Sequence, residues 1–326
     1  MIVDFHNHFF PKPYLDALRE DDTNAKVTEN GEGETIIVVK GDYSIIVEEH
    51  HNAAARAAAL DAAGVDMQCL TTTVPGVHSE TVANGIRLAQ IANDGMAEVM
   101  ASHADRFVAL ATLPLQDPQA SVEELERSVT QGRLRGGILY SHINGEQLDN
   151  QIFWPLYEKA SELGVPLFIH PIVPVNIGPL GDYRLVAISG FLFETSVAVS
   201  RLIFSGVLAR FPNLQLIAAH LGGNLPYLAE RMDAGYRVYP ESRANISEPP
   251  SHFLKRIYMD TFPHSPRAIE FAAEFAGADK ILMGSDYPHQ IGDLPGGVTT
   301  IRETNLSAAD QALILGKNAA ALLGIA

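Results

Sequence analysis

In the stretch MIVDFHNHFF (residues 1–10), two histidines, His6 and His8, stand at the end of a short, mainly apolar run. Its Ile, Val and Phe residues are typical of a buried β-strand. Side chains two positions apart point to the same side of an extended strand. Both imidazoles therefore face one place, where they can share a metal ion if further ligands lie at the ends of other strands.

Seven further β-rich runs follow this one, and helical patterns separate most of them. The eight predicted strands are 2–8, 67–73, 107–113, 136–142, 165–170, 214–220, 257–262 and 280–286. The clearest predicted helices are 52–64, 79–104, 117–132, 153–164 and 266–277. Eight strand–helix alternations, with strands apolar on both faces, predict an α/β fold: a (β/α)8 TIM barrel with its helices outside.

One segment breaks this alternation. Residues 34–49 (ETIIVVKGDYSIIVEE) predict two strands around Lys40-Gly41-Asp42, which is a hairpin signal. We place this small β-hairpin as an insertion of about residues 30–50 after the first barrel strand, within a single domain of residues 1–326. The stretch from Ile172 to Ser189 is predicted to be a long loop and could form a lid.

Composition excludes several classes of function. The formal net charge of −16 argues against a nucleic-acid partner, which needs a basic face to neutralise phosphates. The chain has one cysteine, Cys69, so no internal disulfide is expected, and a reducing compartment is favoured. Neither a signal-peptide pattern nor an uncharged apolar run of about 18 residues is present, so we expect a cytoplasmic protein without a membrane span.

Polar residues that bind metals stand at the ends of four predicted strands. They are His6, His8, His170, His220 and Asp286. The carboxyl ends of barrel strands meet at one mouth, where barrel active sites lie. Imidazole and carboxylate suit zinc, iron or manganese. Three histidines and Asp286 on one cation leave His220 as a general base or acid, although a structural histidine or a fourth metal ligand also fits that position.

Four motifs carry a resemblance to a known family. They are the His-x-His pair at 6–8, IHP at 169–171, AHLGG at 219–223 and GSDYPH at 284–289. With them, nearly the whole chain resembles the amidohydrolase superfamily, and more narrowly the amidohydrolase-2 branch that contains aminocarboxymuconate semialdehyde decarboxylase and γ-resorcylate decarboxylase. The resemblance implies a TIM barrel with a small β insertion.

The same resemblance implies roles for residues. His6, His8, His170 and Asp286 correspond to the ligands of one divalent metal, while His220, with Asp286, corresponds to the groups that handle protons. Family members with a first histidine mostly resemble the zinc-dependent decarboxylase, so zinc is expected, with manganese as the alternative and no organic cofactor. The implied reaction is non-oxidative decarboxylation of an aromatic, heteroaromatic or unsaturated acid.

Substrate contacts are expected from fewer signals. Arg231 corresponds to a family arginine that reaches the neighbouring subunit's site, which implies a homodimer or a higher homo-oligomer. The family's other arginine, from the inserted segment, has no counterpart, and this favours a hydroxylated acid that chelates the metal. His289 and Phe191 are further candidates for substrate contact. His50 and His51 are expected on the surface, flanking a helix, although the inserted hairpin could bring them toward the mouth.

Two other functions fit the same candidate residues. A metal-dependent hydrolase or hydratase, acting on a lactone, an amide or an unsaturated acid, would use the same ligands, because a fold and a metal do not determine the reaction. A metal-bearing barrel that binds a ligand or a partner without turnover is the third hypothesis, after the decarboxylase and the hydrolase or hydratase. The presence of His220 argues against it, since a binding protein needs no proton-transfer group.

Overall fold

The computed structural model describes residues 1–20, 22–39, 42–262 and 265–325, and it has an α/β architecture. Every strand predicted from the sequence is present, the eighth as two pieces. The strands of the two main sheets are β1 (Val3–His8), β5 (Met67–Thr71), β6 (Phe107–Ala109), β7 (Gly137–Tyr140), β10 (Leu167–His170), β11 (Leu216–Ala218), β12 (Tyr258–Asp260), β13 (Ile281–Leu282) and β14 (Gly284–Tyr287).

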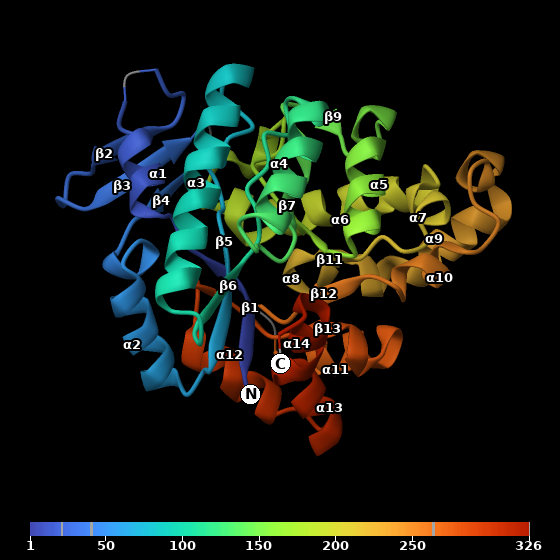
Figure 1. Ribbon diagram of the computed structural model, residues 1–326. Helices are drawn as coiled ribbons and strands as arrows, with labels where there is room; N and C mark the ends of the chain where they lie inside the picture. Colours follow the sequence, from blue (N-terminus) through green and yellow to red (C-terminus); the bar gives the residue numbers. More distant parts are fainter. Residues whose placement is uncertain (21, 40–41, 263–264, 326) are drawn as a thin grey trace.

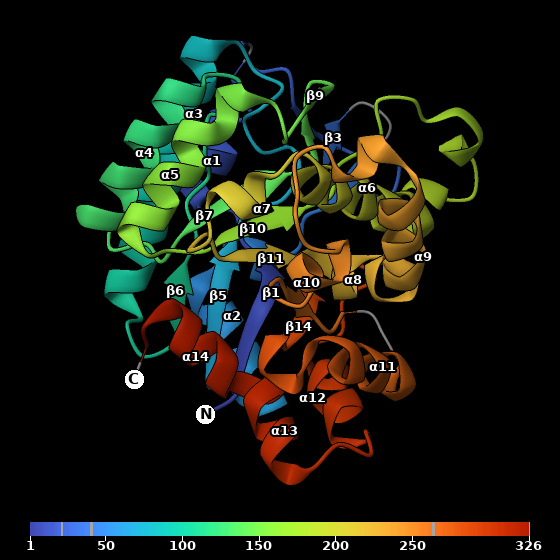
Figure 2. The same ribbon diagram turned by 90° about the vertical axis from the view of Figure 1, so that its right-hand side faces the viewer.

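These strands form two parallel sheets. One has the order β14-β1-β5-β6 and the other has the order β13-β12-β11-β10-β7. A parallel bridge between Ala111 and Gly137 connects the chain after β6 to β7. At the other side, only Met283 separates β13 from β14 along the chain. The strands occupy the centre of the molecule and helices surround them (Figures 1 and 2).

Helices surround these sheets (Figure 2). They are α1 (Lys12–Ala17), α2 (Ala53–Ala63), α3 (Val82–Ser102), α4 (Pro118–Thr130), α5 (Trp154–Leu163), α6 (Phe191–Phe204), α7 (Val207–Arg210), α8 (Ala219–Gly222), α9 (Leu225–Val238), α10 (Pro250–Leu254), α11 (Pro266–Ala276), α12 (Leu294–Arg302), α13 (Ala308–Ala312) and α14 (Asn318–Leu323). Helix α4 begins as the sequence predicts: Asp117 caps the N–H of Ala120, and Pro118 occupies the first turn.

The segment between β1 and α2 contains an antiparallel sheet of its own. Its strands are β2 (Lys26–Glu29), β3 (Thr35–Val39) and β4 (Asp42–Ile45), in the order β2-β3-β4. The sequence predicted the two later strands and missed β2, whose short run is polar and mostly exposed. The predicted turn at Lys40-Gly41 lies outside the described residues. The small sheet lies beside α1 and α3 (Figure 1), and buried Ile37 joins their apolar cluster.

The long segment after β10 leads into an apolar helix. Residues Val186–Phe204 are apolar and long enough to cross a membrane by composition alone, and 44% of the 18-residue window is buried in the fold. Ala198, Val199 and Leu202 of this segment belong to the main hydrophobic core. One face of the segment therefore packs against the core of the α/β unit.

Candidate active site

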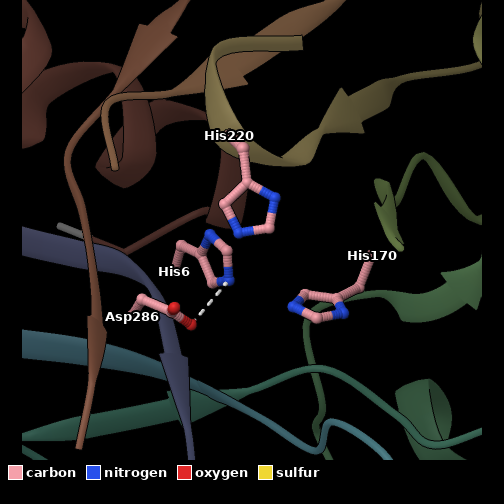
Figure 3. A group of neighbouring side chains, drawn as sticks. All are labelled: His6, His170, His220 and Asp286. Carbon is pink, nitrogen blue, oxygen red and sulfur yellow. Dashed lines mark ion pairs between the residues drawn. The ribbon is translucent and has the colours of Figure 1, made fainter. Parts of the chain in front are cut away.

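Residues predicted from separate strand ends meet in one place. His6, His170, His220 and Asp286 are buried, and one potential ligand atom of each lies within 4.8 Å of the others (Figure 3). His8 joins them, because its Nε2 lies 2.9 Å from Asp286 Oδ1 and 3.2 Å from His6 Nε2. The structure thus brings together all five residues that the sequence singled out.

An unusual backbone conformation orients two of these side chains. His220 and Asp286 both have left-handed φ angles of 56°, a conformation that non-glycine residues seldom adopt. His220 lies two residues after β11 and Asp286 is the penultimate residue of β14, so this backbone conformation directs each side chain into the centre. Gly284 provides the space for this approach: a Cβ there would lie 2.8 Å from His6 Cβ and 3.1 Å from Asp260 Cβ. The GSD triplet therefore needs its glycine for packing and its aspartate for chemistry.

Hydrogen bonds at Nδ1 determine which nitrogen each histidine presents. His6 Nδ1 lies 3.0 Å from Asp260 Oδ2, and His170 Nδ1 lies 2.8 Å from the Pro171 carbonyl oxygen. Both partners are acceptors, so both imidazoles donate from Nδ1 and keep a lone pair on Nε2. This is the arrangement of a metal-binding histidine whose second nitrogen is held by an outer partner.

His8 has the same arrangement through a hydroxyl group. The Thr71 hydroxyl donates to the Asn7 carbonyl oxygen at 2.6 Å, which uses its only hydrogen. Thr71 Oγ1 therefore acts as the acceptor for His8 Nδ1, 3.4 Å away. The Nε2 lone pairs of His6, His8 and His170 are consequently all available beside Asp286.

The electrostatics of the cluster favour a cation. Burial lowers the pKa of His6, but Asp260 and Asp286 outweigh burial and raise it to about 9. Burial raises the pKa of the Asp286 carboxyl to about 7. A positive charge is thus favoured between Asp260 and Asp286, either as a second proton on His6 or as a cation that takes the place of this proton at Nε2. Burial holds the pKa of His8 and of His170 well below the usual value, so both imidazoles stay neutral and able to act as ligands.

The donor set fits a divalent metal ion. Neutral imidazole nitrogens with one carboxylate are the ligands that zinc and manganese accept in proteins. Buried acceptor atoms this close together are costly unless a positive charge lies among them. The ring nitrogen of His220 lies in the same group, so geometry alone leaves it available as a fourth imidazole ligand or as a proton-transfer group.

A cavity of about 360 Å³ opens onto the cluster. His170, His220, Asp286 and His289 lie on its polar side, and its apolar wall is formed by Val74, Ile188, Phe191, Leu192, Phe262 and Ile291. The Phe191 ring lies 6.5 Å from the ring of His170. A planar, mainly apolar ligand with a polar end toward the histidines matches this lining.

The other predicted contacts have different outcomes. His289 lines the cavity, and its ring centre lies 4.6 Å from that of His8. Arg231 is exposed on α9 and is not among the residues described around this cavity. The expectation for His50 was wrong: its side chain is fully buried and hydrogen-bonded to His289, because the chain folds back between the small sheet and α2. His51 is half-buried.

Sequence reasoning missed two residues around this site. Asp260 ends β12 and accepts hydrogen bonds from His6 and from the backbone N–H of His220. Its signal was available, since an aspartate at a strand end within a parallel sheet lies at the same mouth. Arg184, from the segment after β10, lines the cavity and lies 4.4 Å from the centre of the Tyr43 ring. No sequence pattern marks its position.

Comparisons with known proteins agree with this geometry. The family model described as "Amidohydrolase" matches residues 3–325. The 2-amino-3-carboxymuconate-6-semialdehyde decarboxylase of Dictyostelium discoideum is 32% identical over 266 residues, covering 80% of this chain and 73% of that protein. The gamma-resorcylate decarboxylase of Rhizobium sp. (strain MTP-10005) is 30% identical, with 80% and 83% covered.

One solved structure with the same fold contains a bound metal. The 5-carboxyvanillate decarboxylase of Novosphingobium aromaticivorans superposes with a TM-score of 0.84 at 26% identity, covering 99% of this chain and 96% of that one. That structure holds manganese and 4-hydroxy-3-methoxy-5-nitrobenzoic acid. The neighbour thus combines this fold with a divalent metal and an aromatic acid.

Proposed function

The chain belongs to the amidohydrolase family, and from this premise we propose that it is a metal-dependent, non-oxidative decarboxylase, a carboxy-lyase. Its substrate is an aromatic, heteroaromatic or unsaturated carboxylic acid, most suitably a hydroxylated one. The observation that carries the proposal is the meeting of four histidines and Asp286 at one end of a cavity with the size and lining for a planar ring. Relatives that carry decarboxylase names support it.

Two features support a closed (β/α)8 barrel of one domain. The Ala111–Gly137 bridge joins the two parallel sheets on one side, and only Met283 lies between β13 and β14 on the other. The two sheets therefore meet at both edges, and joining them there closes the strands into a barrel. The sheet β2-β3-β4 is then the insertion after the first barrel strand, and the whole chain of 326 residues forms one domain.

We assign one divalent metal ion to His6, His8, His170 and Asp286, and favour zinc over manganese. The available Nε2 lone pairs support the three histidines, and Asp286 supplies the negative charge. When bound, such an ion supplies a positive charge that orients and polarises an acid and its neighbouring oxygen. No organic cofactor is needed for this role.

The protein's own residues then perform the remaining steps. Phe191 and Phe262 hold the ring in the cavity, with its carboxylate toward the histidines. A ring nitrogen of His220 transfers a proton to the ring carbon that bears the carboxylate. The bond between this carbon and the carboxylate breaks, its electron pair restores the conjugation of the ring, and carbon dioxide leaves. Asp286, whose carboxyl is buried beside His8, is the second group positioned to carry a proton.

A positively charged side chain in the lining of the cavity also suits an acidic substrate. Arg184 lines the cavity and supplies a guanidinium close to Tyr43, which compensates for the arginine that the inserted segment lacks. Arg231, exposed on α9, is available to a second copy of the chain, so a homodimer or a higher homo-oligomer is proposed. We also propose a soluble, cytoplasmic enzyme whose partners are small carboxylic acids.

Carbon dioxide release tests this function. The zinc-loaded and the manganese-loaded protein are each incubated with hydroxybenzoates, hydroxypyridine carboxylates, pyrimidine carboxylates and an aminocarboxymuconate semialdehyde. Release of one equivalent of carbon dioxide per acid consumed, absent in His220→Ala, is the expected result. Turnover of lactones or amides, without release from any acid in the panel, would instead assign the site to hydrolysis.

A further inference from the structure

A chain of hydrogen bonds runs from the end of the inserted sheet to the cavity. The backbone N–H of Val47 donates to His50 Nδ1 at 3.1 Å, and His50 Nε2 lies 3.2 Å from His289 Nδ1. His289 in turn lines the cavity. The segment after β4 is thereby connected to the loop after β14, two regions far apart in the sequence.

The direction of this chain is determined by its first donor. A backbone N–H can only donate, so His50 Nδ1 has no proton and His50 carries its proton on Nε2. His50 Nε2–H then donates to His289 Nδ1, which must also be unprotonated. His289 therefore carries its proton on Nε2. One backbone group sets the tautomer of both imidazoles.

His289 differs from the neighbouring histidines in which ring nitrogen carries the proton. His6 and His170 donate from Nδ1 and keep a lone pair on Nε2. His289 does the reverse: its Nδ1 lone pair is used and its Nε2 holds a proton. A ring nitrogen of His289 lies within 4.8 Å of ligand atoms of His8 and Asp286, but the residue has no lone pair left for an ion.

The surroundings of His50 hold it in this position. Its side chain is fully buried, and its ring stacks on Phe10 with centres 5.6 Å apart and an angle of 17°. The Phe10 backbone N–H also donates to the His50 carbonyl oxygen at 2.7 Å. His50 is thus fixed on both its ring and its backbone, and the hydrogen bond to His289 costs little further ordering.

We propose that His289 is a hydrogen-bond donor to the substrate, and that His50 keeps it in the Nε2–H form. The acceptor is a carboxylate or phenolate oxygen of the acid in the cavity, so this inference rests on the proposed function for the identity of its ligand. His289 is neither a metal ligand nor a proton acceptor. His50 acts through His289 and is a positioning residue.

Nitrogen NMR of the zinc-loaded enzyme tests the tautomer directly. With ¹⁵N-labelled histidine, the His289 signals, assigned by their loss in His289→Gln, are expected to show a protonated Nε2 and an unprotonated Nδ1. His50→Phe keeps the ring stacked on Phe10 but removes the donor, so the His289 signals should then show a mixture of tautomers. A proton on His289 Nδ1 in the wild-type enzyme would overturn the inference.

Kinetics and metal content test the contact with substrate. His289→Leu is expected to keep bound zinc and to lose about ten- to hundred-fold in kcat/KM, the range for a hydrogen bond to a charged group. His289→Gln keeps an N–H and should lose less. Loss of zinc in His289→Leu, or wild-type kcat/KM in that variant, would contradict the proposal. Failure of the proposed function would differ, because the wild-type enzyme would then release no carbon dioxide.

Discussion

Asp260 Oδ2 lies 3.0 Å from His6 Nδ1, and through this contact it sets which nitrogen of His6 points to the centre of the site. The same oxygen accepts the backbone N–H of His220 at 3.0 Å. One carboxylate oxygen therefore aligns a candidate ligand on β1 and the strained turn that carries the candidate proton-transfer group. Asp260 thus connects a candidate metal ligand directly to the turn that carries His220.

Asp260→Asn should weaken metal binding about ten- to hundred-fold, the usual cost of losing an outer partner of a metal-binding histidine. The amide can turn either its oxygen or its nitrogen toward His6, so the tautomer of His6 is no longer determined. Competition with a chromophoric chelator measures the affinity. Asp105→Asn, at an exposed position before β6, is the control and should bind metal like the wild type.

Removal of the metal should abolish decarboxylation and lower Tm. A ligand that binds only the folded state stabilises it, by about 4 kcal/mol at a thousand times its Kd. Dialysis against a chelator, followed by scanning calorimetry and carbon dioxide assays, makes both measurements. Zn²⁺ or Mn²⁺ should restore activity, whereas Ca²⁺ should not, because it prefers six to eight oxygen ligands. Full activity in metal-free protein would contradict the assignment.

His220→Asn should lower kcat by about 10²- to 10⁴-fold, the usual contribution of general acid–base catalysis, while metal content stays near one ion per chain. Elemental analysis of the same samples separates the two roles that geometry leaves available. A loss of metal in parallel with activity would identify His220 as a ligand. His252→Asn, at an exposed surface position, serves as the matched histidine control.

Arg184→Gln should raise KM for the acid about tenfold and leave kcat nearly unchanged. The guanidinium lines the cavity, and under the proposed function it attracts the acid, whereas the proton is transferred at the histidine cluster. Arg184→Lys should recover part of the loss. Arg302→Gln changes an exposed arginine on α12 and should keep the wild-type KM. A kcat effect larger than the KM effect in Arg184→Gln would argue against a binding role.

His78 should make the protein less stable at acidic pH. Burial, with the nearby His142, lowers the pKa of His78 from 6.5 to about 4, so the folded state binds fewer protons than the unfolded state between these values. Its stabilising effect is complete above pH 6.5 and is lost as pH falls toward 4, by at most about 3 kcal/mol. Urea unfolding at pH 7.5 and pH 5 measures this difference.

His78→Gln should reduce the loss of stability between these two pH values relative to the wild type, whatever its stability at pH 7.5. The comparison cancels the contribution of the other histidines, which both proteins share. The exposed His252→Gln provides the control, and its pH dependence should match that of the wild type. An equally steep loss in His78→Gln would show that burial of His78 is not its cause.

Much of the fold and of the site was predictable from local signals. The eight strands, the capped helix at Asp117 and the five polar residues at strand ends follow from periodicity and from the rule that parallel strands end at one mouth. The strand β2 was missed because a short, exposed, polar strand is stabilised by its partner β3 and leaves little apolar pattern of its own.

The sequence by itself determined which residues are brought to one place. They are His6, His8, His170, His220 and Asp286, each placed by its position on or directly after a strand. Only the tertiary structure decided what each imidazole can do. The tautomers of His6 and His289 depend on Asp260 and His50, which lie more than 200 residues away along the chain. A hydrogen bond between such distant groups exists only after the strands have packed, so no local pattern can record it.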